Sequence, residues 1–151
     1  MEKLFKYRPN AYHHVTFATK RRKPVLAGDI RQRVLYWFDR IAQENGFQLL
    51  ERNTWLEHVH MLIFVRPGED LSYVMNLLKG TCARQIFLEF TELKLDMREI
   101  HLWGWRFHAE EVPPSAIEAV REYIRDQERI HGQRADRLPV TAWERWQDLE
   151  L

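Results

Sequence analysis

The order of short strand-like segments and longer helical segments is the feature that most constrains the fold of this chain. Runs rich in β-branched and aromatic residues predict four strands, at residues 12–20, 47–53, 58–65 and about 106–112. Apolar residues at helical spacing predict two intervening helices, at residues 29–45 and 70–90. This βαββαβ order predicts an α+β, ferredoxin-like (RRM-like) fold, in which helices pack on an antiparallel sheet.

The ends of these two helices carry local signals. Asp29 and Asp70 are suitable N-cap residues, because a carboxylate can accept hydrogen bonds from the first free backbone N–H groups. Gly46 follows the first helix where a left-handed residue is favourable. Gly80 interrupts the second helical pattern and predicts close packing or a bend.

A third helix is expected after the last strand. Pro113 and Pro114 open it, and Ser115 and Glu118 have the spacing of a capping box. It should run to about His131, because a glycine follows that residue. The added helix extends the ferredoxin-like order by one element.

Length and composition limit the number of domains. With 151 residues, of which 45% are apolar, the chain is expected to form one domain over residues 1–151, with its core at about 11–131. The tail, residues 132–151, could form a short helix that docks on the domain or on a partner subunit, with one side made of Trp143, Trp146 and Leu149.

Charge and cysteine content exclude several classes. The 23 Lys and Arg residues nearly balance the 22 Asp and Glu residues, so a nucleic-acid site must come from local clusters. Cys82 is the single cysteine, and no apolar run resembles a secretory signal or reaches the length of a membrane span. We expect a soluble, cytoplasmic protein.

Two histidines in the predicted strand HVHMLIFV point to a metal site. Side chains alternate across a strand, so His58 and His60 share one face, with about 7 Å between their Cα atoms. The other face is wholly apolar and suits burial under helices. Two imidazoles at this spacing can hold one metal ion, although paired histidines are also common as hydrogen-bonded structural residues.

The third helix carries two further polar residues of interest. Its apolar stripe, which should face the sheet, consists of Ile117, Val120, Ile124 and His131. Tyr123 and Gln127 lie four residues apart on the flank of this stripe. A tyrosine there can be gripped at its ring and exposed at its hydroxyl, and the glutamine can offer its amide oxygen to a metal. Taken alone, such a pair is weak evidence, because a tyrosine at a helix edge usually reflects ordinary half-buried packing.

Five sequence features in order, over about residues 11–131, resemble one protein family. These features are YHHVTFATK with a following basic cluster, LEHVHMLI, LKGTCARQI, LW before the last strand, and AVREYIRDQE. Together they resemble the single-tyrosine HUH transposases of bacterial insertion sequences, the IS200-like family. His58-Val59-His60 fits the histidine, bulky apolar residue, histidine pattern for which HUH is named.

The resemblance implies cleavage and rejoining of single-stranded DNA. In such an enzyme Tyr123 would attack a phosphodiester and remain joined to the 5′ phosphate, and His58, His60 and Gln127 would hold a divalent metal ion. A phenol has a pKa of about 10, so the site must orient it and stabilise charge on the phosphate. Mg²⁺ or Mn²⁺ suits this role, with Mn²⁺ the better match to two imidazoles.

Candidate DNA contacts are basic and aromatic. A basic cluster follows the first strand, and two more basic residues lie in the predicted second helix. These residues are Lys20, Arg21, Arg22, Lys23, Lys79 and Arg84. Trp103, Trp105 and Phe107 could stack on bases or belong to the core, and His108 could join the site or lie at the surface.

The chain departs from the family pattern in two places, and two alternative functions stay open. Leu56 stands where a proline usually precedes the acid before the histidine pair, and Glu110 and Glu111 lie in the last strand. One alternative is a domesticated HUH nickase or relaxase-like enzyme acting on repeat hairpins. The other is a non-catalytic, ferredoxin-like regulator that binds nucleic acid.

Assembly follows from the resemblance and from sheet geometry. The DNA partner is expected to be the hairpin-containing ends of an element. A homodimer is expected, with composite active sites in which the histidine pair of one subunit faces the tyrosine helix of the other. A joined sheet would cover an exposed strand edge, and the Pro113-Pro114 turn could let the helix reach either subunit.

Overall fold

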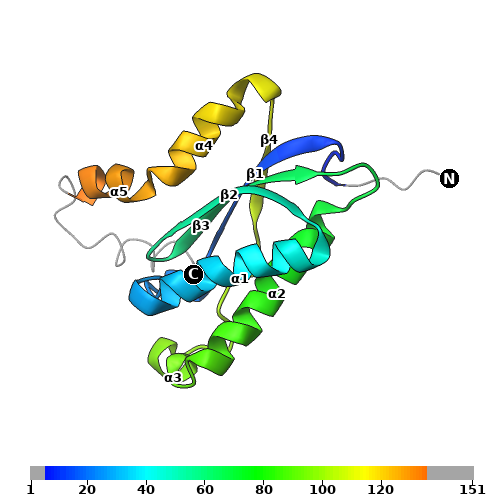
Figure 1. Ribbon diagram of the computed structural model, residues 1–151. Helices are drawn as coiled ribbons and strands as arrows, with labels where there is room; N and C mark the ends of the chain where they lie inside the picture. The colour runs from blue at the N-terminus through cyan, green and yellow to red at the C-terminus, as the bar shows by residue number, and fades with distance from the viewer. Residues whose placement is uncertain (1–5, 136–151) are drawn as a thin grey trace.

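A four-stranded antiparallel sheet forms the centre of the molecule. The computed structural model describes residues 6–135, and their side chains as far as residue 131. The strands run in the order β2-β3-β1-β4 (Figure 1), and they are β1 (Ala11–Ala18), β2 (Gln48–Trp55), β3 (His58–Val65) and β4 (His108–Val112). This order and the intervening helices confirm the predicted ferredoxin-like fold.

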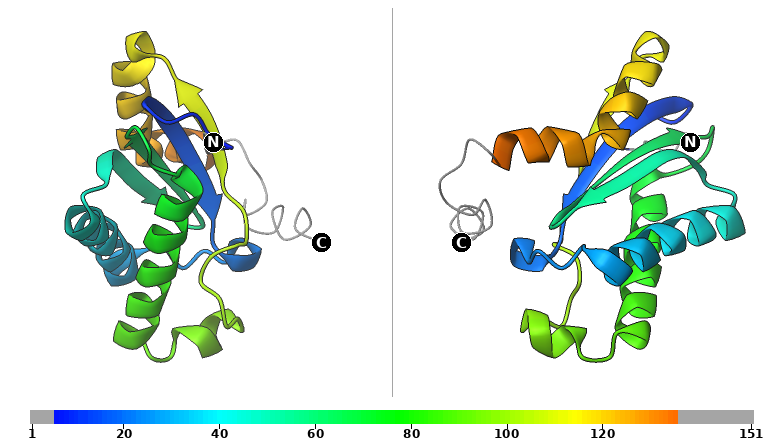
Figure 2. Two further views of the ribbon diagram at one scale, coloured as in Figure 1. Left: turned by 90° about the vertical axis from the view of Figure 1, so that its right-hand side faces the viewer. Right: turned by 60° about the vertical axis from the view of Figure 1, so that its left-hand side comes forward.

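Helices cover both faces of the sheet (Figures 1 and 2). Helices α1 (Gly28–Asn45) and α2 (Leu71–Glu89) lie on one face, and α4 (Ile117–Arg125) and α5 (Gln127–Ala135) lie on the other. The remaining described elements are the short helices η1 (Lys20–Arg22), α3 (Leu93–Met97) and η2 (Pro114–Ala116). Of these, η1 and α3 were not predicted.

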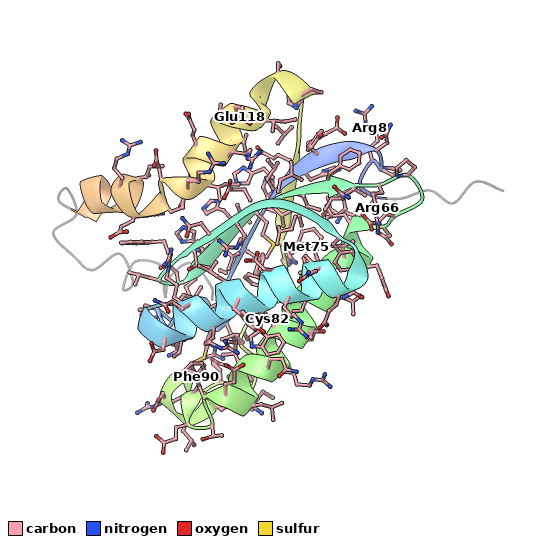
Figure 3. The ribbon with its side chains drawn as sticks, in the orientation of Figure 1. Arg8, Arg66, Met75, Cys82, Phe90 and Glu118 are labelled. Carbon is pink, nitrogen blue, oxygen red and sulfur yellow. The ribbon has the colours of Figure 1, made fainter. Side chains whose placement is uncertain are left out.

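The main core lies between the sheet and helices α1 and α2. Val59, Met61, Ile63 and Val65 of β3 are all buried there, as the alternation of the strand predicts. Met75 and Cys82 of α2, labelled in Figure 3, are fully buried in the same layer. A smaller apolar cluster on the opposite face joins Leu62 to Ile124 of α4, so this second layer positions the tyrosine helix.

The predicted helix signals are confirmed in part. The Asp70 carboxylate accepts a hydrogen bond from the Ser72 amide (3.0 Å), and Gly46 ends α1 in the left-handed conformation. Asp29 is not the N-cap, because α1 begins at Gly28 and Asp29 lies within its first turn, where its charge suits the helix dipole. The capping box is also wrong, because Ser115 lies inside η2 and α4 begins only at Ile117.

Gly80 does not fulfil the expectation of close packing or a bend. Helix α2 runs unbroken from Leu71 to Glu89, and a Cβ atom built at Gly80 would meet nothing within 4 Å. The glycine is exposed on the helix surface. Its lack of a side chain therefore has no packing reason within the described residues.

Two further predictions concern the tail and membrane-spanning helices. The expected tail helix with Trp143, Trp146 and Leu149 lies outside the described residues. Over residues 6–135, the helices are too short or too polar to cross a bilayer.

Candidate active site

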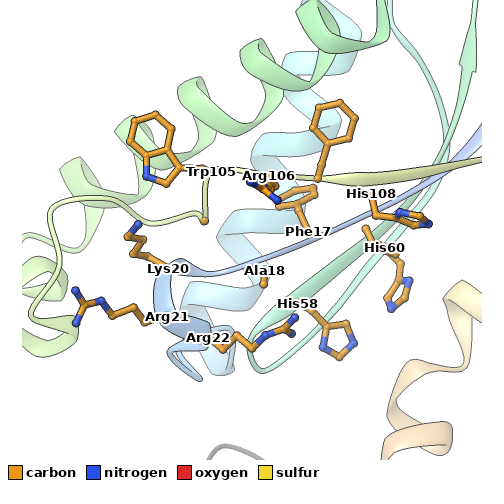
Figure 4. Close-up of a pocket in the computed structure, with 13 residues that line it drawn as sticks. Phe17, Ala18, Lys20, Arg21, Arg22, His58, His60, Trp105, Arg106 and His108 are labelled. Carbon is orange, nitrogen blue, oxygen red and sulfur yellow. The ribbon is translucent and has the colours of Figure 1, made fainter. Parts of the chain in front are cut away.

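The two histidines of β3 lie on the face of the sheet that α4 and α5 cover. Their ring centroids are 5.0 Å apart, and both side chains point toward the α4–α5 segment in Figure 4. The neighbouring Val59 and Met61 point into the opposite core and are fully buried. The pleat of one strand thus separates the candidate ligands from the core.

Glu57 fixes the orientation of His58. Its carboxylate is 1% exposed, and its Oε1 lies 2.7 Å from Nδ1 of His58. A carboxylate accepts, so Nδ1 carries the proton and donates to Glu57, which leaves the lone pair on Nε2. This carboxylate–histidine pair is the arrangement that orients many metal-binding imidazoles.

His14 of β1 supports His60 in a similar way. Nε2 of His14 lies 3.0 Å from Nδ1 of His60, across the β1–β3 pairing. Burial, together with the smaller effects of the neighbouring histidines, lowers the pKa of His60 to about 3, so this ring is neutral at physiological pH. Burial also lowers the pKa of His14. Sequence reasoning had not singled out His14, because its role depends on a strand neighbour 46 residues away.

Tyr123 stands at the edge of this histidine cluster. Its ring lies edge-on to the rings of His60 and His14, at centroid distances of 5.6 and 5.9 Å. The side chain is nevertheless 41% exposed. The ring is therefore held by imidazoles while the residue remains accessible to a substrate.

Gln127 is placed differently from the prediction. The expected single helix breaks at Asp126, so α4 ends at Arg125 and α5 begins at Gln127. Gln127 is fully buried instead of lying on a half-exposed flank beside Tyr123. Asn53 of β2 holds the break, since its Nδ2 donates to the carbonyl oxygens of Ile124 (2.9 Å) and Arg125 (3.2 Å).

The amide of Gln127 has a defined orientation. Its Nε2 donates to the Tyr123 carbonyl oxygen (2.9 Å), so Oε1 points toward Nε2 of His58 (3.4 Å) and Nε2 of His131 (3.0 Å). His131 in turn stacks on Trp55, with ring planes only 5° apart. His131 thus lies against β2 as its place in the apolar stripe predicts, and it also contacts the site.

The donor atoms suit a divalent cation. With the proton of His58 on Nδ1, its Nε2 and the Oε1 of Gln127 are two electron-pair donors that face each other at 3.4 Å. His60 is neutral and adds a second imidazole. Among the residues with described side chains, no three His, Cys, Asp or Glu residues are arranged to hold a metal. A metal here would therefore depend on the amide of Gln127 in addition to the two histidines.

A basic groove adjoins the histidine pair. This cavity of about 1090 Å³ lies between η1 and the 104–108 segment, and Figure 4 shows the side chains along it. His58, His60 and His108 line one part. The other part is basic and aromatic, and its lining side chains include Lys20, Arg21, Arg22, Trp105 and Arg106. The structure thus brings three of the predicted basic residues to the histidines.

The aromatic candidates separate into core and surface. Trp103 is buried, packs edge-on against Phe17 at 5.0 Å, and donates to the Lys79 carbonyl oxygen. Trp105 is 82% exposed, and the Lys20 ammonium lies 5.9 Å from its ring centroid. Trp105 is therefore the candidate among them that presents most of its ring to a ligand.

The other predicted basic residues lie apart from the groove. The Lys79 ammonium donates to the carbonyl oxygens of Gly104 (2.8 Å) and Arg106 (3.3 Å), and burial lowers its pKa to about 8. Its charge therefore holds the 104–106 segment in place. Arg84 lies one turn further along α2, and Lys23 caps η1 beyond the groove.

A single chain brings the tyrosine and the histidines together. The connection between β4 and α4 is short, so α4 folds back over β2 and β3 of its own sheet. The expected composite site, in which the histidine pair of one subunit faces the helix of another, stays a prediction.

Comparisons with known proteins agree with the fold and the motif. The family model described as "Transposase IS200 like" matches residues 7–127. The transposase for insertion sequence element IS200 of Salmonella typhimurium is 26% identical over 118 residues, which is 78% of this chain and 77% of that protein. The ISDra2 transposase TnpA of Deinococcus radiodurans is 25% identical over 115 residues, 76% of this chain and 82% of its own length.

Solved structures show the same architecture. A crystal structure of a candidate transposase from Deinococcus radiodurans superposes with a TM-score of 0.65 at 27% identity, over 84% of this chain and 98% of that chain. A REP-associated tyrosine transposase bound to a REP hairpin has a TM-score of 0.62 at 16% identity, over 87% and 75% of the two chains, and shows the shared fold. Fold and family model together define the chain as a transposase. Among transposases, it belongs to the IS200-like family.

Proposed function

We propose that this transposase cleaves and rejoins single-stranded DNA by transesterification at Tyr123. The observation that carries the proposal is the placement of an exposed tyrosine beside His60 and His14, with Gln127 turned toward His58 four residues later. The membership of the IS200-like family supports the same chemistry.

The proposed reaction conserves one phosphodiester bond. The Tyr123 hydroxyl oxygen bonds to phosphorus, the bond from phosphorus to the 3′ oxygen breaks, and the 5′ phosphate stays on the tyrosine. The phenol loses one proton and the leaving 3′ oxygen gains one, so the step is balanced. Attack by another 3′ hydroxyl reverses it and joins new ends, without ATP.

We propose that His58, His60 and Gln127 hold a divalent ion, Mg²⁺ or Mn²⁺. When bound, this ion would supply charge stabilisation and a template for the phosphate oxygens. Glu57 and His14 orient the two imidazoles, and the tyrosine carbonyl fixes the glutamine amide. Hydrogen bonds within the chain therefore orient all three proposed ligand side chains.

The expected DNA is single-stranded and flanked by a hairpin. The REP-associated tyrosine transposase binds a REP hairpin, which supports a hairpin at the ends recognised by this chain and keeps a repeat-processing nickase as the second candidate. In the basic groove, Lys20, Arg21 and Arg22 would neutralise phosphates near the tyrosine. We also propose a homodimer, since β2 and β4 are the free edges of the sheet.

A covalent-adduct assay tests the proposal. The protein is incubated with single-stranded oligonucleotides carrying hairpin-forming element ends, with Mg²⁺ or Mn²⁺, and adducts are resolved by denaturing electrophoresis. The wild-type chain should form an adduct, whereas Tyr123→Phe should form none and keep most of its DNA affinity, because the ring packing is retained. Adduct formation by Tyr123→Phe at the wild-type rate would exclude Tyr123. A wild-type chain that binds single strands and never forms an adduct would favour the non-catalytic regulator.

A further inference from the structure

A second cavity shares part of its lining with the basic groove. It has a volume of about 470 Å³ and is formed by α2, Lys94 of α3 and the 100–105 segment. Gly104 and Trp105 line both cavities, so the second cavity continues from the groove beside the histidines. The volume is within the range of small-ligand sites.

The walls of the second cavity are aromatic and positively charged. Phe87 of α2 and the exposed Trp105 both line it, and the Lys94 ammonium is 5.1 Å from the Phe87 ring centroid. Arg84 adds a second exposed cation, and no Asp or Glu occurs among the described residues that line the cavity. Aromatic faces combined with cations favour a ligand that has a flat ring and a negative charge.

Gly80 is one of the residues that line this cavity. The residue lies in the middle of α2, where glycine is the least favourable residue after proline. Its backbone is helical and needs no positive φ, and a Cβ there would meet nothing within 4 Å. The helix therefore carries an unfavourable residue for which its own packing gives no reason. A ligand in the cavity, which Gly80 lines, would provide one.

We propose that the second cavity binds one unpaired nucleotide of the same DNA strand that occupies the basic groove. The base would stack on the wall formed by Phe87 and Trp105, and the adjoining phosphate would lie near Arg84 and Lys94. Lys79 contributes indirectly, because its hydrogen bonds to Gly104 and Arg106 hold the segment that lines both cavities. This inference rests on the proposed action on single-stranded DNA and extends it to a nucleotide away from the tyrosine.

Two substitutions at Gly80 separate binding from stability. Gly80→Ala adds one methyl group, whereas Gly80→Gln places a longer side chain in the cavity, and both residues favour a helix. Both variants should therefore raise Tm, by about 2–4 °C. In the Tyr123→Phe background, affinity is measured by fluorescence anisotropy, with Mg²⁺ and a labelled pool of 20-nucleotide single strands of random sequence.

The two variants should differ in DNA affinity. Gly80→Ala should bind as the parent does, and Gly80→Gln should bind roughly five- to a hundredfold more weakly, the range given by loss of one base-stacking contact. Equal affinity of both variants would overturn the inference, while the adduct assay with the wild-type chain would still support the proposed function. If the wild-type chain neither binds single strands nor forms an adduct, the proposed function fails and this inference fails with it.

Photocrosslinking locates the nucleotide directly. The same pool is prepared with 5-iododeoxyuridine, irradiated on the protein and analysed by peptide mass spectrometry. Phe87 lines only the second of these two cavities, so a crosslink at Phe87 that is lost in Gly80→Gln is the expected result. Crosslinks restricted to the basic groove would contradict the inference.

Discussion

Replacing Glu57 with glutamine tests whether a buried carboxylate sets the ligand strength of His58. The Glu57 carboxylate is 1% exposed and lies 2.7 Å from Nδ1 of His58, so the bond is charge-assisted and poorly screened. Charge-assisted bonds contribute about 1.5–3 kcal/mol and neutral ones about 0.5–1.5 kcal/mol. The substitution should therefore cost roughly 1–2 kcal/mol of metal binding, since the neutral amide no longer stabilises positive charge on the imidazole.

The expected change is large enough to measure. A cost of about 1.4 kcal/mol is a tenfold change in Kd, and loss of such an outer contact typically weakens metal binding by about 10- to 100-fold. Isothermal titration of the metal-free protein with Mn²⁺ gives the Kd directly, and adduct formation should recover in part at high Mn²⁺. The isosteric amide preserves the packing, which circular dichroism verifies.

Glu110→Gln is the matched control. It removes the same charge from an exposed position on β4, where the carboxylate lies 3.1 Å from Nε2 of His108. This variant should leave the Mn²⁺ Kd within about twofold of wild type, because exposed charge pairs contribute little. If Glu57→Gln also stays within that range, the carboxylate does not tune His58 and the reasoning is refuted.

Three further predictions concern the support of the site. Asn53→Ala should lower the free energy of unfolding in urea by about 1–3 kcal/mol and slow adduct formation, because two carbonyl oxygens at the α4–α5 break lose their donor. Asn45→Ala, at the exposed end of α1, should have a smaller effect on both the free energy of unfolding and the rate of adduct formation. Mixing Tyr123→Phe chains with His58→Ala/His60→Ala chains should restore no cleavage if the cis site is the active one, and restored activity in exchanging subunits would instead establish the trans site. The folded-state pKa of Lys79 is about 8 and an unfolded lysine titrates near 10.4, so the unfolded chain binds more protons between these values. The stability of wild type relative to Lys79→Met should therefore rise as pH increases from about 8 to 10.4, and a flat or falling difference would contradict the burial of this ammonium.

Elements with strong periodicity were predictable from the sequence. Strand β3 occupies residues 58–65 as predicted, and α2 lies within one residue of its expected bounds. Both elements are buried along a full face, so the spacing of their apolar residues carries the signal. The short elements η1 and α3 have no such pattern, because three or five residues cannot show a helical period.

The supporting residues of the site were less predictable than its candidate ligands. A histidine pair and a tyrosine–glutamine pair have recognisable spacings within one element. His14 and Asn53 act through partners 46 and 71 residues away, and neither belongs to a local pattern. Such contacts arise only when β1 and β2 are placed in the sheet, so they depend on tertiary structure.

The break at Asp126 explains how two residues one helical turn apart reach different environments. In a continuous helix Tyr123 and Gln127 would share one face and similar exposure. In this structure Tyr123 is 41% exposed and Gln127 is fully buried, which allows one residue to meet a substrate and the other to meet His58. The different environments of Tyr123 and Gln127 therefore depend on the contacts that hold the break between α4 and α5.

Strand β2 holds it through three alternate residues on one face. The Glu51 carboxylate accepts from Arg125 of α4 (2.9 Å), Asn53 donates to the carbonyl oxygens at the break, and Trp55 stacks on His131 of α5. Their spacing of two is the pleat of the strand, and their order follows the helices from α4 to α5. The position of the tyrosine relative to the histidines is thus specified by β2, a strand that supplies none of the proposed ligands. Substitutions on this face should alter the chemistry without touching metal or DNA.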